Sequence, residues 1–146
     1  MSDDARIWTV SQVNRAVRSM LESAVDALWV AGEVTNWTRS RQHHCYFTLK
    51  DDRAQLRCVL FARDGARLPT DPQEGMQVRV FGSLTLYEPR GDYQLVARRL
   101  EAEGGEGLWR LAFEKLRAKL EAEGLLDPAR KRRLPRFPAT VGVVTS

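Results

Sequence analysis

Five stretches of the chain have the alternation of hydrophobic and polar residues, or the β-branched and aromatic content, that is typical of β-strands. In the second stretch, Phe47 and Leu49 fall on one face, while Tyr46 and Lys50 fall on the other. The third is a mainly apolar run that Arg57 interrupts. The predicted strands are Leu28–Val34, His44–Lys50, Gln55–Phe61, Met76–Leu86 and Tyr93–Glu101.

Residues that favour turns and loops separate these strands. Asn36–His43 has cationic and amide side chains but no aliphatic residue, so we expect an exposed loop. Ala62–Gly75 is rich in turn formers and leaves room for one helical turn, and YEPRGD has the composition of a hairpin turn. Gly82 in the middle of the fourth strand predicts a bulge or a sharp bend, which a small barrel needs in order to close.

Two helices are predicted outside the strands. Thr9–Ser23 begins with a capping box, in which Thr9 is the N-cap and Gln12 its partner. Leu108–Glu123 places Trp109 and Phe113 on one apolar face, which is more often packing than a binding surface. The predicted fold is therefore mainly β with flanking helices: a five-stranded OB-like barrel, one N-terminal helix and one C-terminal helix.

The pattern divides the chain into five segments. We expect an N-terminal helix packed on the barrel (1–24), the barrel (25–103), a connecting helix (104–126), a basic proline-containing linker (127–138) and the first strand of a following domain (139–146). The linker is either a solvated connection or a basic strip along the path of a nucleic acid. Because VGVVTS reads as a buried strand without partners, we expect the chain to be part of a longer protein.

Composition adds a preference for anionic partners. The net charge is +4 over 146 residues, with 19 Arg and 4 Lys. Arginine is suited to bidentate phosphate contacts and to stacking on bases, although a genome that favours Arg codons explains the bias equally well.

No catalytic or metal-binding pattern is visible in the sequence. Cys45 and Cys58 are not in a C-x-x-C spacing, and we expect two buried thiols. His44 and Cys45 are adjacent in a strand and point to opposite faces, which disfavours a shared zinc ion. Asp51 and Asp52 have the setting of a turn. We therefore expect a binding module that needs no cofactor. Without an apolar run of ~20 residues or a signal peptide, we expect a cytoplasmic protein with no membrane partner.

Four motifs in a fixed order carry a family resemblance. GEVTNW, HHCYFTLKD, QLRCVLF and LYEPRGDYQL resemble the N-terminal domain of the large subunit of exodeoxyribonuclease VII, over Trp8–Ser146. The resemblance implies an OB-fold that binds single-stranded DNA. It further implies a parent enzyme that hydrolyses single-stranded DNA to oligonucleotides without a metal, and that works with a small helical subunit. The hydrolytic domain lies further along such chains. His43 stands where the family usually has Gly.

OB-folds bind oligonucleotides on the face of strands two and three and through the loops between strands one and two and strands four and five. Trp37 is the preferred candidate for base stacking, because it lies beside arginines in the expected loop. The candidate nucleic-acid-binding residues are Trp37, Arg39, Arg41, His44, Tyr46, Lys50, Arg57, Arg63, Tyr87, Arg90 and Tyr93.

Two other functions remain open from the residues alone. One is an RNA-binding or tRNA-binding OB-fold, which a competition between DNA and RNA oligonucleotides distinguishes. The other is a protein-interaction module for subunit assembly, which would bind no oligonucleotide. If the resemblance to exodeoxyribonuclease VII holds, the expected partners are single-stranded DNA and the small helical subunit, which would bind through the missing part of the chain.

Overall fold

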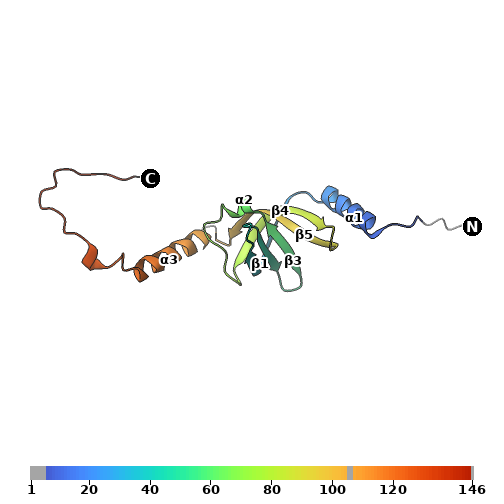
Figure 1. The fold of residues 1–146 in the computed structure, drawn as a ribbon, viewed down its shortest axis with the longest axis horizontal. Helices are drawn as coiled ribbons and strands as arrows, with labels where there is room; N and C mark the ends of the chain where they lie inside the picture. Colours follow the sequence, from blue (N-terminus) through green and yellow to red (C-terminus); the bar gives the residue numbers. More distant parts are fainter. Residues whose placement is uncertain (1–5, 105–106, 146) are drawn as a thin grey trace, which may run out of the picture. The chain divides into compact units, whose positions relative to one another are not determined.

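The computed structural model describes residues 6–104 and 107–145. Contacts divide the chain into two units, residues 1–112 and 113–146. The elements, shown in Figure 1, are α1 (Val10–Ala24), β1 (Leu28–Arg39), β2 (Cys45–Lys50), β3 (Gln55–Leu60), α2 (Ala62–Gly65), β4 (Gln77–Tyr87), β5 (Asp92–Ala102), α3 (Gly107–Ala122) and the 3-10 turn Pro128–Arg130.

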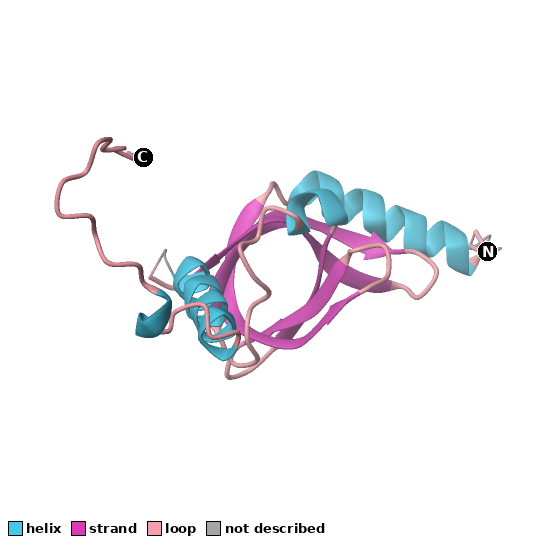
Figure 2. Ribbon diagram, turned by 60° about the vertical axis from the view of Figure 1, so that its left-hand side comes forward, coloured by secondary structure: helices cyan, strands magenta, loops and turns pink. Residues whose placement is uncertain are grey.

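The five strands form one closed barrel. Their order is β1-β2-β3-β5-β4, and β4 pairs back onto β1. All neighbours are antiparallel except β3 and β5, which run parallel. Figure 2 looks into the ring of strands. This topology, with a short helix between β3 and β4, is the OB-fold, so the predicted mainly β fold with flanking helices is confirmed.

The barrel interior is filled by the inward residues of every strand. Val34, Leu60, Val80 and Leu95 are almost completely buried, one from each of four strands. In β2 the burial alternates residue by residue, with Phe47 and its inward neighbours buried and the residues between them more exposed. Removing such side chains from water stabilises the fold by about 1.5–3 kcal/mol each. Both cysteines are free and buried, as expected.

Strand β1 is longer than predicted, so the expected loop from Asn36 to His43 is wrong in its first half. Pairing with β2 continues as far as Arg39 opposite Cys45, with a β-bulge between Thr35 and Thr38. Asn36 has φ +56° within this bulge, a left-handed conformation that Asn tolerates better than most residues. The remaining connection contains His43 at φ +62°, so the conformation for which Gly is the usual residue is present with His in its place.

Gly82 lies at the predicted bend. The pairing of β4 with β5 shifts between Phe81 and Gly82, so a bulge is present. A Cβ atom on Gly82 would lie 2.3 Å from the carbonyl oxygen of Val96. The two strands can approach this closely only because the position has no side chain.

Helix α1 begins with the predicted capping box. The Thr9 hydroxyl accepts from the Gln12 amide at 3.2 Å, and the Thr9 amide donates to the Gln12 side chain at 2.8 Å. The helix contacts the β4–β5 hairpin through polar groups: Asn14 donates to the Glu88 carbonyl at 2.8 Å, and Arg18 pairs with the Glu88 carboxylate. Its apolar side chains Val10, Val13, Val17 and Met20 are exposed.

Helix α3 contributes Leu108 to the core, whereas the stripe Trp109, Phe113 and Leu116 is exposed. None of the helices in residues 6–104 and 107–145 combines the length and the hydrophobicity that a membrane crossing requires. Residues 131–145 form no helix or strand. That 139–146 opens a strand of a further domain therefore stays a prediction. Residues 1–5, 105–106 and 146 of the predicted segments lie outside the described residues.

Burial of Cys58 makes a pH-dependent contribution to stability. Desolvation raises the pKa of this thiol from its ordinary 9.0 to about 12. Because the folded state disfavours the thiolate, the contribution is complete below pH 9.0 and is lost as the pH rises toward 12. Between these values the free energy of unfolding of the wild type should fall faster than that of Cys58→Val, by up to about 1.4 kcal/mol per pH unit. Urea titrations at several pH values measure this, and parallel curves would contradict it.

We expect Gly82→Ala to lower the free energy of unfolding by about 3 kcal/mol, or to prevent folding, because the new methyl group meets backbone that cannot move without breaking the β4–β5 pairing. Urea denaturation followed by circular dichroism measures the change. Gly142→Ala is the control, since a Cβ there meets nothing within 4 Å. Equal stability of the two variants would show that the barrel closes without the constraint at Gly82.

Candidate nucleic-acid interface

A cleft of about 530 Å³ lies over the outer face of β2 and β3 and reaches the β4–β5 hairpin. Four aromatic residues line it: Phe47 is buried, and the other three are close to half exposed, Tyr46 at 46%, Phe61 at 45% and Tyr87 at 44%. We call it the aromatic cleft. Its lining is Asn36, Tyr46, Phe47, Thr48, Arg57, Cys58, Val59, Phe61, Tyr87, Arg90, Asp92 and Gln94. Half-exposed rings offer faces on which bases can stack.

Two cations and one carboxylate give the aromatic cleft its charge. Arg57 on β3 donates to Asp92 at the start of β5, with 2.9 Å between Nη1 and Oδ2. The Arg90 guanidinium lies 5.4 Å from the centre of the Tyr87 ring, in the β4–β5 turn. The cleft therefore combines stacking surfaces with a net positive charge, the two features that bind a single strand.

Phe61 is the aromatic residue of the cleft that the candidate set lacks. It follows β3 directly and precedes α2, in extended conformation. The His44 ring meets it edge-on, with centroids 5.3 Å apart and an angle of 90°. His44 also accepts a hydrogen bond at Nδ1 from the Ala62 amide at 3.0 Å, which satisfies a free donor at the start of α2. His44 therefore supports Phe61 from behind. The sequence does contain a signal for Phe61. Arg57, Val59 and Phe61 are two residues apart, so an extended chain places Phe61 on the same face as Arg57.

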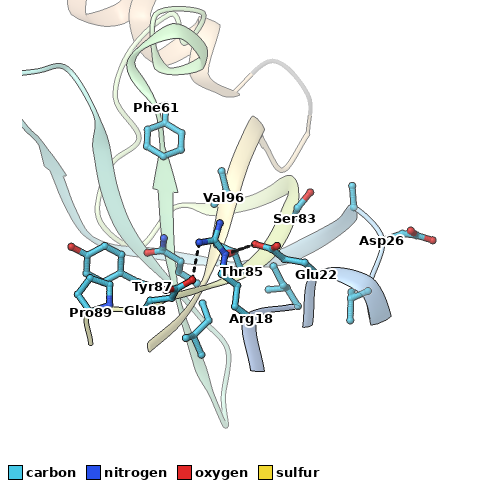
Figure 3. Close-up of a pocket in the computed structure, with 15 residues that line it drawn as sticks. Arg18, Glu22, Asp26, Phe61, Ser83, Thr85, Tyr87, Glu88, Pro89 and Val96 are labelled. Atoms are coloured by element: carbon cyan, nitrogen blue, oxygen red, sulfur yellow. Dashed lines mark hydrogen bonds and ion pairs between the residues drawn. The ribbon is translucent and has the colours of Figure 1, made fainter. Parts of the chain in front are cut away.

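A second hollow of about 740 Å³, the α1 pocket, adjoins the aromatic cleft and is shown in Figure 3. Phe61, Tyr87 and Gln94 line both. On its helical side Arg18 pairs with Glu22 at 2.9 Å and Glu88 at 3.2 Å, the dashed contacts in Figure 3. A hydrogen bond from Thr85 and then one from Arg18 lower the pKa of Glu22.

Four of the eleven candidate residues lie together in the aromatic cleft: Tyr46, Arg57, Tyr87 and Arg90. Arg41 and Arg63 are exposed, in the β1–β2 connection and in α2, but neither lines the cleft. Lys50 and Tyr93 line a different hollow, which includes Leu28 and Leu56, and Lys50 pairs with Glu33 at 3.0 Å. Arg39 donates hydrogen bonds to the Asp71 carboxylate, and this interaction raises the Arg39 pKa.

Trp37 is placed differently from the sequence prediction. It lies in β1 and not in a loop, and it packs against the barrel core with its ring 4.9 Å from that of Phe47. The cause is the bulge at Asn36, which turns the following side chain inward. The expectation that Trp37 lies in an exposed polar loop beside two arginines is therefore wrong. Among the described residues, no group of three His, Cys, Asp or Glu side chains could hold a metal ion.

Fold and cleft together define a small β-barrel of the class that binds oligonucleotides on this face. The family described as OB-fold nucleic acid binding domain matches residues 8–101, about two thirds of the chain. The chain belongs to this family, and the matched region covers strands β1 to β4 and all but the last residue of β5.

Several solved structures have a similar fold at low sequence identity. A chain of the Replication Protein A heterotrimer bound to ssDNA is 14% identical with a TM-score of 0.45, over 66% of this chain and 74% of that chain. A chain of the S. pombe Stn1-ten1 complex is 20% identical with a TM-score of 0.47, over 69% and 76%. Asparaginyl-tRNA synthetase from Pyrococcus horikoshii is 16% identical with a TM-score of 0.42, over 58% of this chain and 22% of the synthetase. These likenesses concern the fold alone.

We expect Trp37→Ala to destabilise the fold and to leave the aromatic cleft usable. Loss of the ring packed on Phe47 should lower the free energy of unfolding by about 3 kcal/mol. Trp37→Phe keeps a ring at this site and should cost less than about 1.5 kcal/mol. Urea denaturation gives the stabilities, and a titration with labelled oligonucleotide on the folded fraction gives the affinity. A large loss of affinity with unchanged stability would instead show that Trp37 contacts the oligonucleotide.

Proposed function

We propose that this domain binds single-stranded DNA in the aromatic cleft. The observation that carries the proposal is the convergence of Tyr46, Phe61 and Tyr87, from three separate parts of the chain, on one cleft that also contains Arg57 and Arg90. Rings of this exposure have free faces for bases, while guanidinium groups contact phosphates. A duplex would keep its bases stacked within the helix, so a stacking cleft favours a single strand.

The finer proposal is that the domain is the N-terminal part of an exodeoxyribonuclease VII large subunit. Its support is that the motifs of the resemblance supply lining residues of the cleft: HHCYFTLKD contains Tyr46 and Thr48, and LYEPRGDYQL contains Tyr87 and Arg90. On this proposal, the domain captures a strand and delivers it to a hydrolytic domain outside this chain. The small helical subunit would bind outside this chain as well. The chain itself should leave DNA intact.

We expect Tyr46→Ala to weaken binding of a labelled oligo-dT by about 1–3 kcal/mol, the range for the loss of one base stack. Tyr93→Ala is the matched control, because Tyr93 is 55% exposed and lies outside the aromatic cleft. Fluorescence anisotropy measures the affinities. Equal losses for the two variants, or no binding by the wild type at low salt, would contradict the proposed cleft.

Arg90→Ala should lower the slope of log affinity against log salt by about 0.7, the share of one phosphate on a single strand. Arg41→Ala removes the same charge outside the cleft and should change the slope less. Competition with oligo-U separates DNA from RNA binding, and tighter RNA binding would favour the RNA-binding alternative. Gel analysis of the recovered end-labelled DNA should show intact strands; degradation that is lost on mutation of this chain would show a catalytic site within it.

A further inference from the structure

A second aromatic and cationic surface lies on the outer face of β1, β4 and β5, outside the aromatic cleft. Trp29 on β1 is paired with Phe81 on β4, and Phe81 is paired with Arg99 on β5, so the three side chains form one row across the sheet. The Trp29 and Phe81 ring centres are 5.3 Å apart. Trp29 is 45% exposed, comparable with the rings of the cleft. We call this row and the adjoining Arg79 and Arg98 the Trp29 patch.

The charge of the Trp29 patch is positive. The Arg79 guanidinium lies 5.3 Å from the centre of the Trp29 ring and also binds Glu101 at 2.7 Å, so Glu101 neutralises one cation. Arg98 and Arg99 are exposed and form no ion pair with any residue that the structure describes. The patch therefore presents two uncompensated guanidinium groups beside a half-exposed indole. A single strand of nucleic acid, with its phosphates and flat bases, has the complementary chemistry.

The α1 pocket extends from the aromatic cleft around the barrel toward the Trp29 patch. Phe61 lines both hollows, and the α1 pocket continues over Val96 and Ser83, which are paired across β5 and β4. Both are labelled in Figure 3. Ser83 and Phe81 are two residues apart on β4 and so share its outer face. Stacking residues therefore lie on either side of the α1 pocket, in the aromatic cleft and, one outward position along β4 from Ser83, in the Trp29 patch.

The helical wall of the α1 pocket limits how a strand could cross. Glu22 on α1, Asp26 just after it and Glu88 of the β4–β5 turn line this side of the pocket against the single cation Arg18, so it repels phosphates. A strand that crosses the pocket would keep its phosphates on the side away from α1, toward β5. That is the strand that carries Arg98 and Arg99.

From this arrangement we infer that the Trp29 patch is a second contact for the same single strand, used when the strand is long enough to leave the aromatic cleft and pass around the barrel. Trp29 stacks one base, and Arg99 contacts a phosphate beside it. The inference rests on the proposed function, since the cleft must hold the first part of the strand. It predicts an occluded length above that of the cleft alone.

The test compares two oligo-dT lengths, about 6 and about 16 nucleotides, within the range that OB-folds occupy. Trp29→Ala should weaken binding of the longer strand about tenfold and leave the shorter unaffected. Trp109→Ala is the control, because Trp109 on α3 is 68% exposed and lies outside the patch. This variant should leave the affinities for both oligonucleotides unchanged. Arg99→Ala should lower the salt slope by about 0.7 for the longer strand only. Its charge-matched control is Arg117→Ala, whose partner is Glu121.

The outcomes separate the two proposals. If the wild type does not bind the shorter strand, the proposed function fails. If the wild type binds both lengths and neither Trp29→Ala nor Arg99→Ala changes the longer complex, the second contact is overturned, as it would be if the patch served a protein partner. Equal losses on both lengths also overturn it. Should Trp29→Ala fail to fold, because Phe81 loses its neighbour, the exposed Arg99 decides the matter alone.

Discussion

The barrel depends on the close approach of β4 to β5 at Gly82. There a single missing Cβ lets the Val96 carbonyl come within a distance that no other residue could accept. The bulge at this point adds Arg98 to the β5 side and changes which β5 residues face outward. Ser83 and Val96 on one side of the bend line the α1 pocket, and Phe81 on the other side lies beside Trp29. The close approach at Gly82, which lets the barrel close, therefore also determines where the residues of the α1 pocket and the Trp29 patch lie.

The sequence predicts those strands whose outer face is polar and whose inner face is aliphatic. Alternation of Phe47 and Leu49 with polar neighbours places β2 correctly, and a glycine within an apolar strand marks the bend. Prediction from the sequence fails at Asn36–Arg39, because the polar residues of an exposed strand have the same composition as those of a loop. Contacts with residues distant in sequence hold this segment in place: the pairing with β2, and the Glu74 carboxylate that accepts from the Asn36 amide. The left-handed Asn36 then reverses the expected direction of Trp37.

The cationic candidate residues fall into two groups, those that the folded chain pairs with a carboxylate and those that it leaves unpaired. Arg39, Lys50 and Arg57 read alike as free cations in the sequence, yet each is held by a carboxylate: Asp71 from the segment before β4, Glu33 on β1, and Asp92 on β5. None of these pairs is local, so no spacing rule of helix or strand could reveal them. The count of 23 Lys and Arg residues thus overstates the number of cations that are free to meet a phosphate.

The pair between Arg57 and Asp92 shapes how the aromatic cleft can bind. It is a solvent-exposed pair, so it adds little stability. It does hold the guanidinium at the cleft, and a phosphate that binds Arg57 must replace one anion with another. Arg90 forms no ion pair with any described residue, so a phosphate there displaces only mobile counterions. Salt dependence should therefore come mainly from Arg90, while the rings of Tyr46, Phe61 and Tyr87 supply affinity that salt does not screen. A cleft of this kind retains single strands without reading their sequence, because every base has a face on which to stack.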